Sequence, residues 1–284
     1  MAAIGIVGAG IMGADIALNC AAFGHQVVLL DIDPLALDNF KQTLAQKLRG
    51  YRMMGCKFEL ATADAILAQV ECRTDYAALG QVDWVIENVT EDVTIKAGVY
   101  AQLREVCKPE TIFMINTSCI PITKLASGMP YPERVVGAHF MNPVPLKKLV
   151  EVVQGFYTSD ATLAQVKTLL TSLGKTSVVV KDFPGFVANR LSHLFMNEAA
   201  FLVQDGVAKP KEIDAIFRDG YGHKMGPLET ADLIGLDTVL RSLDVLYQHY
   251  QDPKFRCCPL LRQMVDAGVL GKKSGKGFHE YRDQ

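Results

Sequence analysis

Short runs of apolar residues alternate with helical patterns along the first two thirds of the chain. Seven runs rich in Val and Ile predict strands, at residues 3–7, 26–30, 82–86, 111–115, 134–138, 149–153 and 176–180. Several of these runs are almost continuously apolar, which is typical of strands buried on both faces of a sheet. The alternation of strands and helices therefore predicts an α/β domain with a mostly parallel sheet covered by helices.

The segments between these strands carry the three-to-four spacing of amphipathic helices. Residues 11–23 form one such segment, directly after the first strand. A second helix begins near residue 35, and its apolar residues share one face: Leu37, Phe40, Leu44, Leu48 and Tyr51. Asp33 followed by Pro34 predicts the N-cap and the first residue of this helix.

The pattern changes at Asp182-Phe183-Pro184-Gly185, where Pro and Gly end the last strand. The residues that follow show helical periodicity and no convincing strand, with one apolar face formed by Val187, Leu191, Leu194, Phe195 and Leu202. We therefore expect two domains, an α/β domain over residues 1–184 and an all-helical domain over residues 185–284.

Composition and charge describe an ordinary globular protein. Hydrophobic residues make up 49% of the chain and charged residues 21%, and 29 Lys and Arg balance 31 Asp and Glu. This balance gives no electrostatic reason to expect nucleic acid or a membrane surface as a partner. No segment is long and apolar enough to span a bilayer, and the N-terminus lacks the basic region of a secretory signal.

The seven cysteines are scattered along the chain and show no metal-ligand spacing, so we expect no metal site. They are interpreted as reduced thiols, mostly buried, in a cytoplasmic protein.

A glycine-rich motif joins the first strand to the first helix. Gly8-Ala9-Gly10-Ile11-Met12-Gly13 has the GxGxxG spacing, and Asp31 ends the next strand, 18 residues after Gly13. Glycines at these positions allow a tight turn and close approach of a pyrophosphate to the helix N-terminus. A carboxylate at position 31 accepts hydrogen bonds from the ribose of NAD and repels the 2′-phosphate of NADP. The motif predicts a Rossmann-type, doubly wound domain that binds NAD.

Ordered motifs along nearly the whole chain resemble the 3-hydroxyacyl-CoA dehydrogenase family, which includes the 3-hydroxybutyryl-CoA dehydrogenases. The most specific segment is His139-Phe140-Met141-Asn142-Pro143-Val144-Pro145, followed by Leu149-Val150-Glu151-Val152. The other matches are Asn116-Thr117-Ser118, residues 184–190, Gly226-Pro227 and residues 271–278. The resemblance implies reversible, NAD-dependent oxidation of the 3-hydroxyl of a 3-hydroxyacyl thioester. It also implies a homodimer formed through the helical domain.

Oxidation of a secondary alcohol requires a base for the hydroxyl proton, and His139 is the candidate. The family's catalytic histidine falls at this position, and Glu151 resembles its partner acid. A carboxylate next to the imidazole fixes the tautomer and stabilises the imidazolium. Glu151 lies within an apolar run, where an unpaired carboxylate is costly to bury. The sequence leaves open that Glu151 faces solvent.

Three further residues resemble the substrate site of the family. Ser118 follows a strand at the edge where open α/β sheets bind ligands, and by resemblance it hydrogen-bonds the substrate oxygen. Asn189 resembles an asparagine that completes the site from the helical domain, and Asn142 is a weaker candidate. A turn serine and a cap asparagine are the structural alternatives.

On the cofactor side, Glu91 and Lys96 match an acid and a lysine near the nicotinamide ribose, and Asn116 is placed there by the same resemblance. The alternative is a solvated acid at a helix start with a lysine nearby. Lys47 belongs to a basic stretch of residues 41–57 that in the family helps to hold the CoA nucleotide, although such a stretch is equally often a solvated face.

The chain departs from the family pattern at Asn88, where alanine is usual, at Cys119, and in a short connection after the second helix. These departures leave the acyl carrier open: CoA, as in fatty acid metabolism, or an acyl carrier protein, as in polyketide extender-unit biosynthesis. Two alternatives of another kind are a non-catalytic NAD-binding protein and a β-hydroxyacid dehydrogenase that uses a lysine. The presence of His139, Glu151 and Ser118 argues against both.

Overall fold

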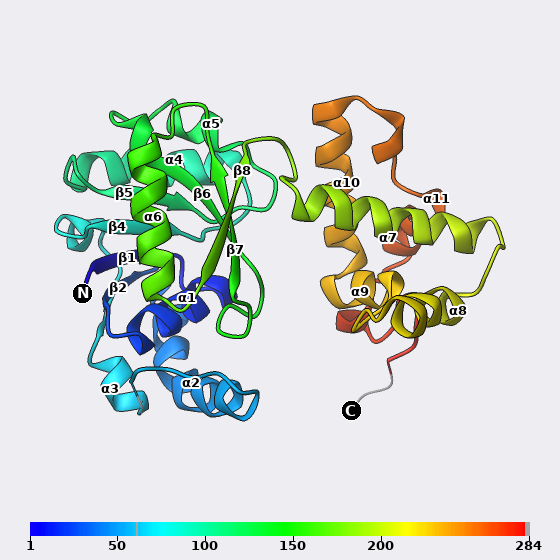
Figure 1. Ribbon diagram of the computed structural model, residues 1–284, viewed down its shortest axis with the longest axis horizontal. Coiled ribbons are helices and arrows are strands. Elements are labelled where there is room, and N and C mark those ends of the chain that lie inside the picture. Colours follow the sequence, from blue (N-terminus) through cyan, green and yellow to red (C-terminus); the bar gives the residue numbers. More distant parts are fainter. Residues whose placement is uncertain (61, 282–284) are drawn as a thin grey trace. The chain divides into compact units, whose positions relative to one another are not determined.

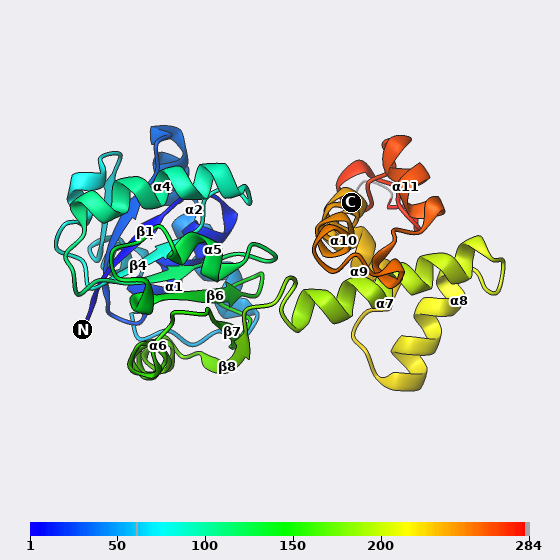
Figure 2. The same ribbon diagram turned by 90° about the horizontal axis from the view of Figure 1, so that it is seen from above.

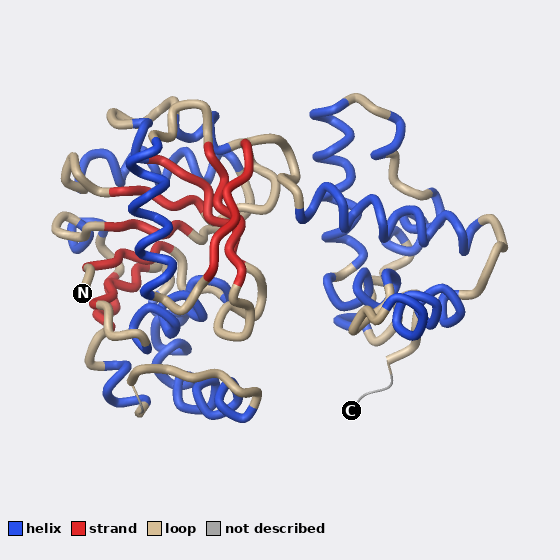
Figure 3. The backbone as a smooth tube through the Cα atoms, viewed as in Figure 1, coloured by secondary structure: helices blue, strands red, loops and turns tan. Residues whose placement is uncertain are grey.

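The computed structural model describes residues 1–60 and 62–281, and the chain divides into two compact units, Met1–Phe183 and Pro184–Gln284. Figure 1 follows the chain through both units, and in Figure 3 the red strands of the sheet all belong to the first. We describe each unit by itself.

The first unit contains a sheet of eight strands in the order β3-β2-β1-β4-β5-β6-β7-β8. Neighbouring strands are parallel except for β6 and β7, which are antiparallel. The strands are β1 Ala3–Val7, β2 Gln26–Leu30, β3 Val70–Arg73, β4 Trp84–Glu87, β5 Ile112–Ile115, β6 Val135–Phe140, β7 Leu149–Gln154 and β8 Thr176–Lys181. This architecture confirms the predicted α/β class with a doubly wound sheet.

Helices cover both faces of this sheet. They are α1 Ile11–Ala22, α2 Pro34–Met53, α3 Ala63–Leu67, α4 Val93–Val106, α5 Ile122–Ala126 and α6 Asp160–Ser172, with short 3-10 turns η1 Tyr76–Leu79 and η2 Pro132–Arg134. One apolar core joins α1, α2 and α6 to the sheet, with members such as Ile16, Leu44 and Leu170. Helix α4 lies on the opposite face from α6 (Figure 2), and its Tyr100 contacts Phe113 of β5 edge to face.

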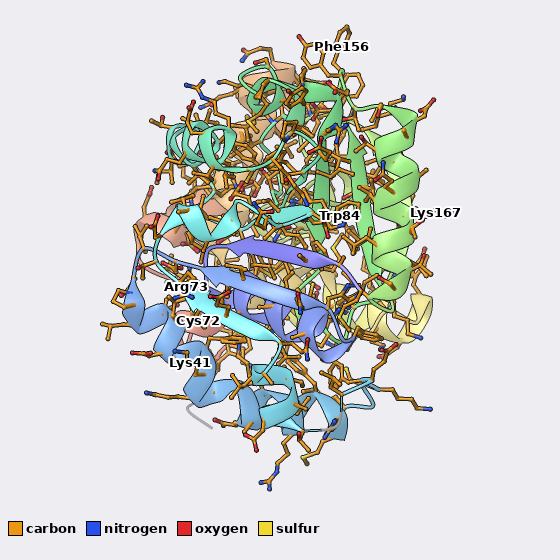
Figure 4. All side chains as sticks on the ribbon, turned by 90° about the vertical axis from the view of Figure 1, so that its left-hand side faces the viewer. Lys41, Cys72, Arg73, Trp84, Phe156 and Lys167 are labelled. Carbon is orange, nitrogen blue, oxygen red and sulfur yellow. The ribbon has the colours of Figure 1, made fainter. Side chains whose placement is uncertain are left out.

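All seven predicted strands are present, and β1 and β2 have the predicted bounds. The sequence analysis missed β3, because its four residues include Glu71 and Arg73 and show no apolar run. Those charged side chains are exposed, since β3 is an edge strand that pairs only with β2. Figure 4 shows Cys72 and Arg73 of β3 close to Lys41 of α2.

The predicted start of α2 is confirmed. Pro34 is the first helical residue, and the Asp33 carboxylate accepts a hydrogen bond of 2.9 Å from the Leu35 backbone N–H. This bond satisfies one of the donors that a helix leaves without an internal partner at its N-terminus.

The second unit is helical, as predicted. Its helices are α7 Ala188–Gln204, α8 Pro210–Ala215, α9 Pro227–Ile234, α10 Leu236–Tyr250 and α11 Pro259–Asp266, with the turns η3 Ile216–Gly220, η4 Pro253–Phe255 and η5 Lys272–Ser274. Helices α7, α9 and α10 enclose a core that includes Met196, Ala231 and Leu243. In the described part of this unit, β pairing is limited to isolated bridges at Lys276.

Two fully buried aspartates tie the end of the second unit to its helices. Asp232 accepts hydrogen bonds of 2.9 Å from the backbone N–H groups of Phe278 and His279. Asp214 accepts two bonds from the first turn of α9 and lies 2.6 Å from His279 Nε2. A Cβ on Gly277 would lie 1.9 Å from Asp232 Oδ1, so only glycine allows this approach.

No helix of residues 1–60 and 62–281 combines the length and the apolar character needed to cross a bilayer.

The hydroxyl of Tyr100 gives a test of packing in the first unit. It is buried between α4 and β5 without a hydrogen-bond partner in the described residues, and burial raises the pKa of Tyr100 well above its usual value. Removing an unpaired buried polar group lowers the cost of folding, so Tyr100→Phe should raise the free energy of unfolding by about 1 kcal/mol. Urea unfolding measures the change. Tyr157→Phe, which alters a half-exposed ring, is the control, and a less stable Tyr100→Phe variant would contradict the assignment.

Candidate active site

The residues of the candidate site follow parallel strands at one edge of the sheet. Strands β1, β4, β5 and β6 run in the same direction, so their carboxyl ends meet at the edge where open α/β sheets bind ligands. The Asn116 side chain joins these ends: its Nδ2 donates to Asn88 Oδ1 at 2.8 Å, and its Oδ1 accepts from the Phe140 N–H at 3.2 Å.

The glycine motif between β1 and α1 forms the turn that its sequence predicts. Gly8 has φ +94°, and a Cβ at this position would lie 2.9 Å from the Asn88 carbonyl oxygen. A Cβ on Gly13 would lie 1.7 Å from the Gly8 carbonyl oxygen, so helix α1 can pack against the turn only with glycine here. A Cβ on Gly10 would meet no protein atom within 4 Å. This open backbone at a helix N-terminus, next to Ile11 and Met12, fits a pyrophosphate.

Asp31 lies beside this turn at the end of β2. Its Oδ2 accepts a hydrogen bond of 2.6 Å from the Ala9 N–H, and its Oδ1 accepts one of 2.9 Å from the Asp33 N–H. A carboxylate oxygen has two lone pairs, so each oxygen can accept a further bond. The carboxylate therefore braces the glycine turn and retains the capacity to bind ribose hydroxyls. These features fit the NAD that the sequence predicts.

A buried ion pair joins the last residue of β4 to helix α4. Lys96 and Glu87 are both fully buried, and Lys96 Nζ is 2.7 Å from Glu87 Oε1. Burial raises the pKa of Glu87, while the Lys96 ammonium acts in the opposite direction. Lys96 also donates to the Asn116 carbonyl oxygen at 3.1 Å, and Glu91 Oε2 lies 3.9 Å away. The nearest acid to Lys96 is therefore Glu87, which the sequence analysis did not select.

His139 and Glu151 face each other across the antiparallel pair β6–β7. They are directly opposed in the strand register, both are buried, and His139 Nδ1 lies 3.0 Å from Glu151 Oε2. This geometry rules out the alternative in which Glu151 faces solvent. Because a carboxylate only accepts hydrogen bonds, the ring carries its proton on Nδ1, and the neutral ring then presents the lone pair of Nε2.

Ser118 lies on the other side of the ring, in the turn after β5. Its Oγ is 3.4 Å from His139 Nε2. The structure therefore brings Ser118, His139 and Glu151 together as a chain of contacts, with the imidazole between the hydroxyl and the carboxylate. A general base with an orienting acid requires this order.

Asn142 lies on the β6–β7 connection, three residues after His139 of β6, and is exposed. Lys175 holds this connection from the start of β8, since its Nζ donates to the carbonyl oxygens of Val144 at 2.6 Å and Lys147 at 3.1 Å. Burial lowers the pKa of Lys175 to about 8.

Lys47 forms an ion pair with a buried acid of the first unit. Its Nζ lies 2.9 Å from Asp15 Oδ1, and Tyr51 donates to the other oxygen of the same carboxylate at 2.5 Å. Lys47 thus pairs α2 with a buried acid of α1, and its side chain is 30% exposed.

Asn189 belongs to the second unit, where it is the second residue of α7. Its carbonyl oxygen accepts a hydrogen bond of 2.9 Å from His193 Nδ1 when this nitrogen carries the proton.

Four residues that contact the segments of the site were not predicted from the sequence as site residues: Glu87, Asn88, Thr117 and Lys175. Glu87 carried a visible signal, because it is a charged residue that ends an otherwise apolar buried strand. The contacts of Lys175 and Thr117 join residues far apart in the chain, and no local pattern predicts them.

Both halves of the chain match models of one family. Residues 3–183 match the NAD binding domain of 3-hydroxyacyl-CoA dehydrogenase, and residues 185–281 match the C-terminal domain of 3-hydroxyacyl-CoA dehydrogenase.

Individual relatives match over almost their full length. A probable 3-hydroxybutyryl-CoA dehydrogenase of Bacillus subtilis is 42% identical over 279 residues, which covers 98% of this chain and 97% of the relative. A probable 3-hydroxybutyryl-CoA dehydrogenase of Deinococcus radiodurans is 44% identical over 278 residues, covering 98% and 99%. The crystal structure of (S)-3-hydroxybutyryl-CoA dehydrogenase from Ralstonia eutropha has a TM-score of 0.94 and 41% identity, and covers all of both chains. The chain belongs to the 3-hydroxyacyl-CoA dehydrogenase family, and it is an oxidoreductase that uses NAD.

Proposed function

We propose that the protein oxidises the 3-hydroxyl of a short 3-hydroxyacyl-CoA to the 3-ketoacyl-CoA, reversibly. The observation that carries this proposal is the pair of contacts on the His139 ring, from Ser118 Oγ to Nε2 and from Nδ1 to Glu151 Oε2. The names of the relatives support CoA as the carrier and a four-carbon acyl group, and the Ralstonia enzyme supports the (S) alcohol.

Ser118, His139 and Glu151 each have a separate role in this proposal. His139 Nε2 accepts the proton of the substrate hydroxyl during oxidation and returns it during reduction. Glu151 fixes the ring by accepting the Nδ1 proton and stabilises the imidazolium that forms. Ser118 donates a hydrogen bond to the substrate oxygen. Asn189 and Asn142 contact the substrate, and Lys47 contacts its carrier once it leaves Asp15.

The residues proposed to bind the cofactor lie at the carboxyl edge of the sheet. The open turn at Gly10 and the N-terminus of α1 hold the pyrophosphate, and Asp31 holds the adenosine ribose. Glu91, Lys96 and Asn116 border the nicotinamide end. NAD, when bound, supplies the hydride acceptor for the alcohol carbon.

The helical unit is proposed to form a homodimer. Large apolar side chains are exposed on η3, directly after it and on α9: Ile216 at 56%, Tyr221 at 71% and Leu233 at 55%. Exposed apolar side chains at this density are typical of an interface with a second subunit.

The reaction is tested with acetoacetyl-CoA and with the same acyl group on an acyl carrier protein, by following NADH oxidation. His139→Ala should lower kcat by about 10² to 10⁴, the usual loss when a general base is removed. NADH binding, measured by fluorescence titration, should remain unchanged, because the ring is not part of the glycine turn.

His249→Ala, which changes an exposed histidine of α10, is the control. Turnover of the carrier-protein substrate alone would replace CoA in the proposal. Full activity of His139→Ala would remove this residue from the mechanism.

Glu151→Gln should keep the fold and the NADH affinity but lower kcat by roughly 10²-fold or more, since an amide cannot stabilise the imidazolium. Steady-state kinetics measure the loss, and thermal unfolding checks the fold. Glu105→Gln, a substitution on the exposed end of α4, should have wild-type kinetics. A Glu151→Gln variant with wild-type kcat would end the dyad assignment.

Leu233→Lys should convert the dimer to a monomer, because a charge would then be buried in the interface. Light scattering after size-exclusion chromatography measures the mass. Met53→Lys, at an exposed apolar position of the first unit, should leave the mass unchanged. A wild-type chain that elutes as a monomer would contradict the proposal.

A further inference from the structure

One carboxylate oxygen accepts several hydrogen bonds from the turn that carries Ser118. Glu91 Oε1 accepts hydrogen bonds from Thr117 Oγ1 at 2.6 Å, from the Ser118 N–H at 2.8 Å and from the Cys119 N–H at 3.1 Å. Three consecutive residues therefore donate to the same atom, and the backbone of Ser118 is fixed on Glu91.

Thr117 closes the turn from inside. Its hydroxyl donates to Glu91 and at the same time accepts from the Ile120 N–H at 3.0 Å. The Thr117 side chain is 3% exposed, so water has little access to its hydroxyl. The Glu91 carboxylate and the Thr117 hydroxyl thus both accept hydrogen bonds from the turn 117–120.

Glu91 is itself held in place. It comes directly before α4, whose N-cap Asp92 accepts from the Thr94 and Ile95 N–H groups. Its Oε2 lies 3.9 Å from Lys96 Nζ, and Lys96 also binds the Asn116 carbonyl oxygen at the start of the same turn. The segment after β4 therefore sets the position of the segment after β5 at two points.

These contacts use the hydrogen-bonding capacity that Glu91 Oε1 would need to bind the nicotinamide ribose. Two lone pairs of Glu91 Oε1 already serve three donors, so this atom has no capacity for a further strong bond. Only Oε2, on a side chain that is 42% exposed, remains for a ligand or for Lys96.

We propose that Glu91 and Thr117 are positioning residues for Ser118, which hold its hydroxyl at the 3.4 Å contact with His139 Nε2. Their loss displaces the hydroxyl and lowers kcat. This role rests on the proposed function, because it requires Ser118 to contact the substrate oxygen.

The two positions offer conservative partners that separate hydrogen bonding from charge. Glu91→Gln keeps an oxygen that can accept from the turn, and Thr117→Ser keeps the hydroxyl. Glu91→Ala and Thr117→Val remove these groups. Misplacement of a reacting contact by about 1 Å costs on the order of 10²-fold in rate. We therefore expect kcat to fall by about 10- to 100-fold in Glu91→Ala and Thr117→Val and to recover most of this loss in Glu91→Gln and Thr117→Ser.

The decisive measurement is a double-mutant cycle with Ser118→Ala. If Glu91 acts through Ser118, Glu91→Ala should change kcat little once the serine hydroxyl is absent. NADH affinity, measured by fluorescence titration, should stay at the wild-type value in the Thr117 variants, and Glu105→Ala serves as the matched control on α4. Thermal unfolding checks each fold, and Thr117→Val carries the test if Glu91→Ala does not fold.

Three results would overturn the proposal: losses that multiply with that of Ser118→Ala, a Glu91→Gln variant as slow as Glu91→Ala, or a loss of NADH affinity with kcat unchanged. None of these results alters turnover by the wild-type protein or its loss in His139→Ala. Failure of this inference can therefore be told apart from failure of the proposed function.

Discussion

The reversal of the chain between β6 and β7 is the constraint on which the site depends. In a parallel sheet, neighbouring strands are joined by helices, whereas an antiparallel pair sets residues directly opposite each other. His139 and Glu151 occupy one such opposed pair, and both are buried. A buried carboxylate without a partner is costly, so burial itself forces Glu151 onto the imidazole. Strand register, rather than loop geometry, therefore orients the ring.

Charged and amide side chains near the carboxyl edge of the sheet also fix the turns that follow β4 and β5. The buried pair of Lys96 and Glu87 contributes little net stability, because desolvation offsets the attraction between the charges. Its effect is geometric, since Lys96 has further donors and uses one on the Asn116 carbonyl oxygen. Asn116 then bonds Asn88 and the Phe140 N–H, one residue from His139. The departure from alanine at position 88 is thus compensated by a new bond at the same edge.

Periodicity and turn chemistry predicted most of the fold, because they report buried faces and backbone restrictions that are local in the chain. The seven predicted strands and the cap at Asp33 depend on such signals, and the charged edge strand β3 lacked them. The facing of His139 and Glu151 could be expected only through the family resemblance. The contacts of Thr117 with Glu91, of Lys175 with Val144 and of Lys47 with Asp15 join residues 26 to 32 positions apart, and no spacing rule selects those partners.

Four of the motifs that carry the family resemblance fall into two physical classes. Those at residues 116–118 and 139–151 surround one titratable ring, and their residues contact one another through side chains that can exchange protons. Those at Gly226 and at residues 271–278 surround the buried carboxylates of Asp214 and Asp232, where an added Cβ on Gly226, Gly271 or Gly277 would overlap the aspartate. Because buried carboxylates must be fully hydrogen-bonded, these glycines are required for folding and need no ligand to explain them. The geometry therefore separates the residues that can perform chemistry from those that close the fold.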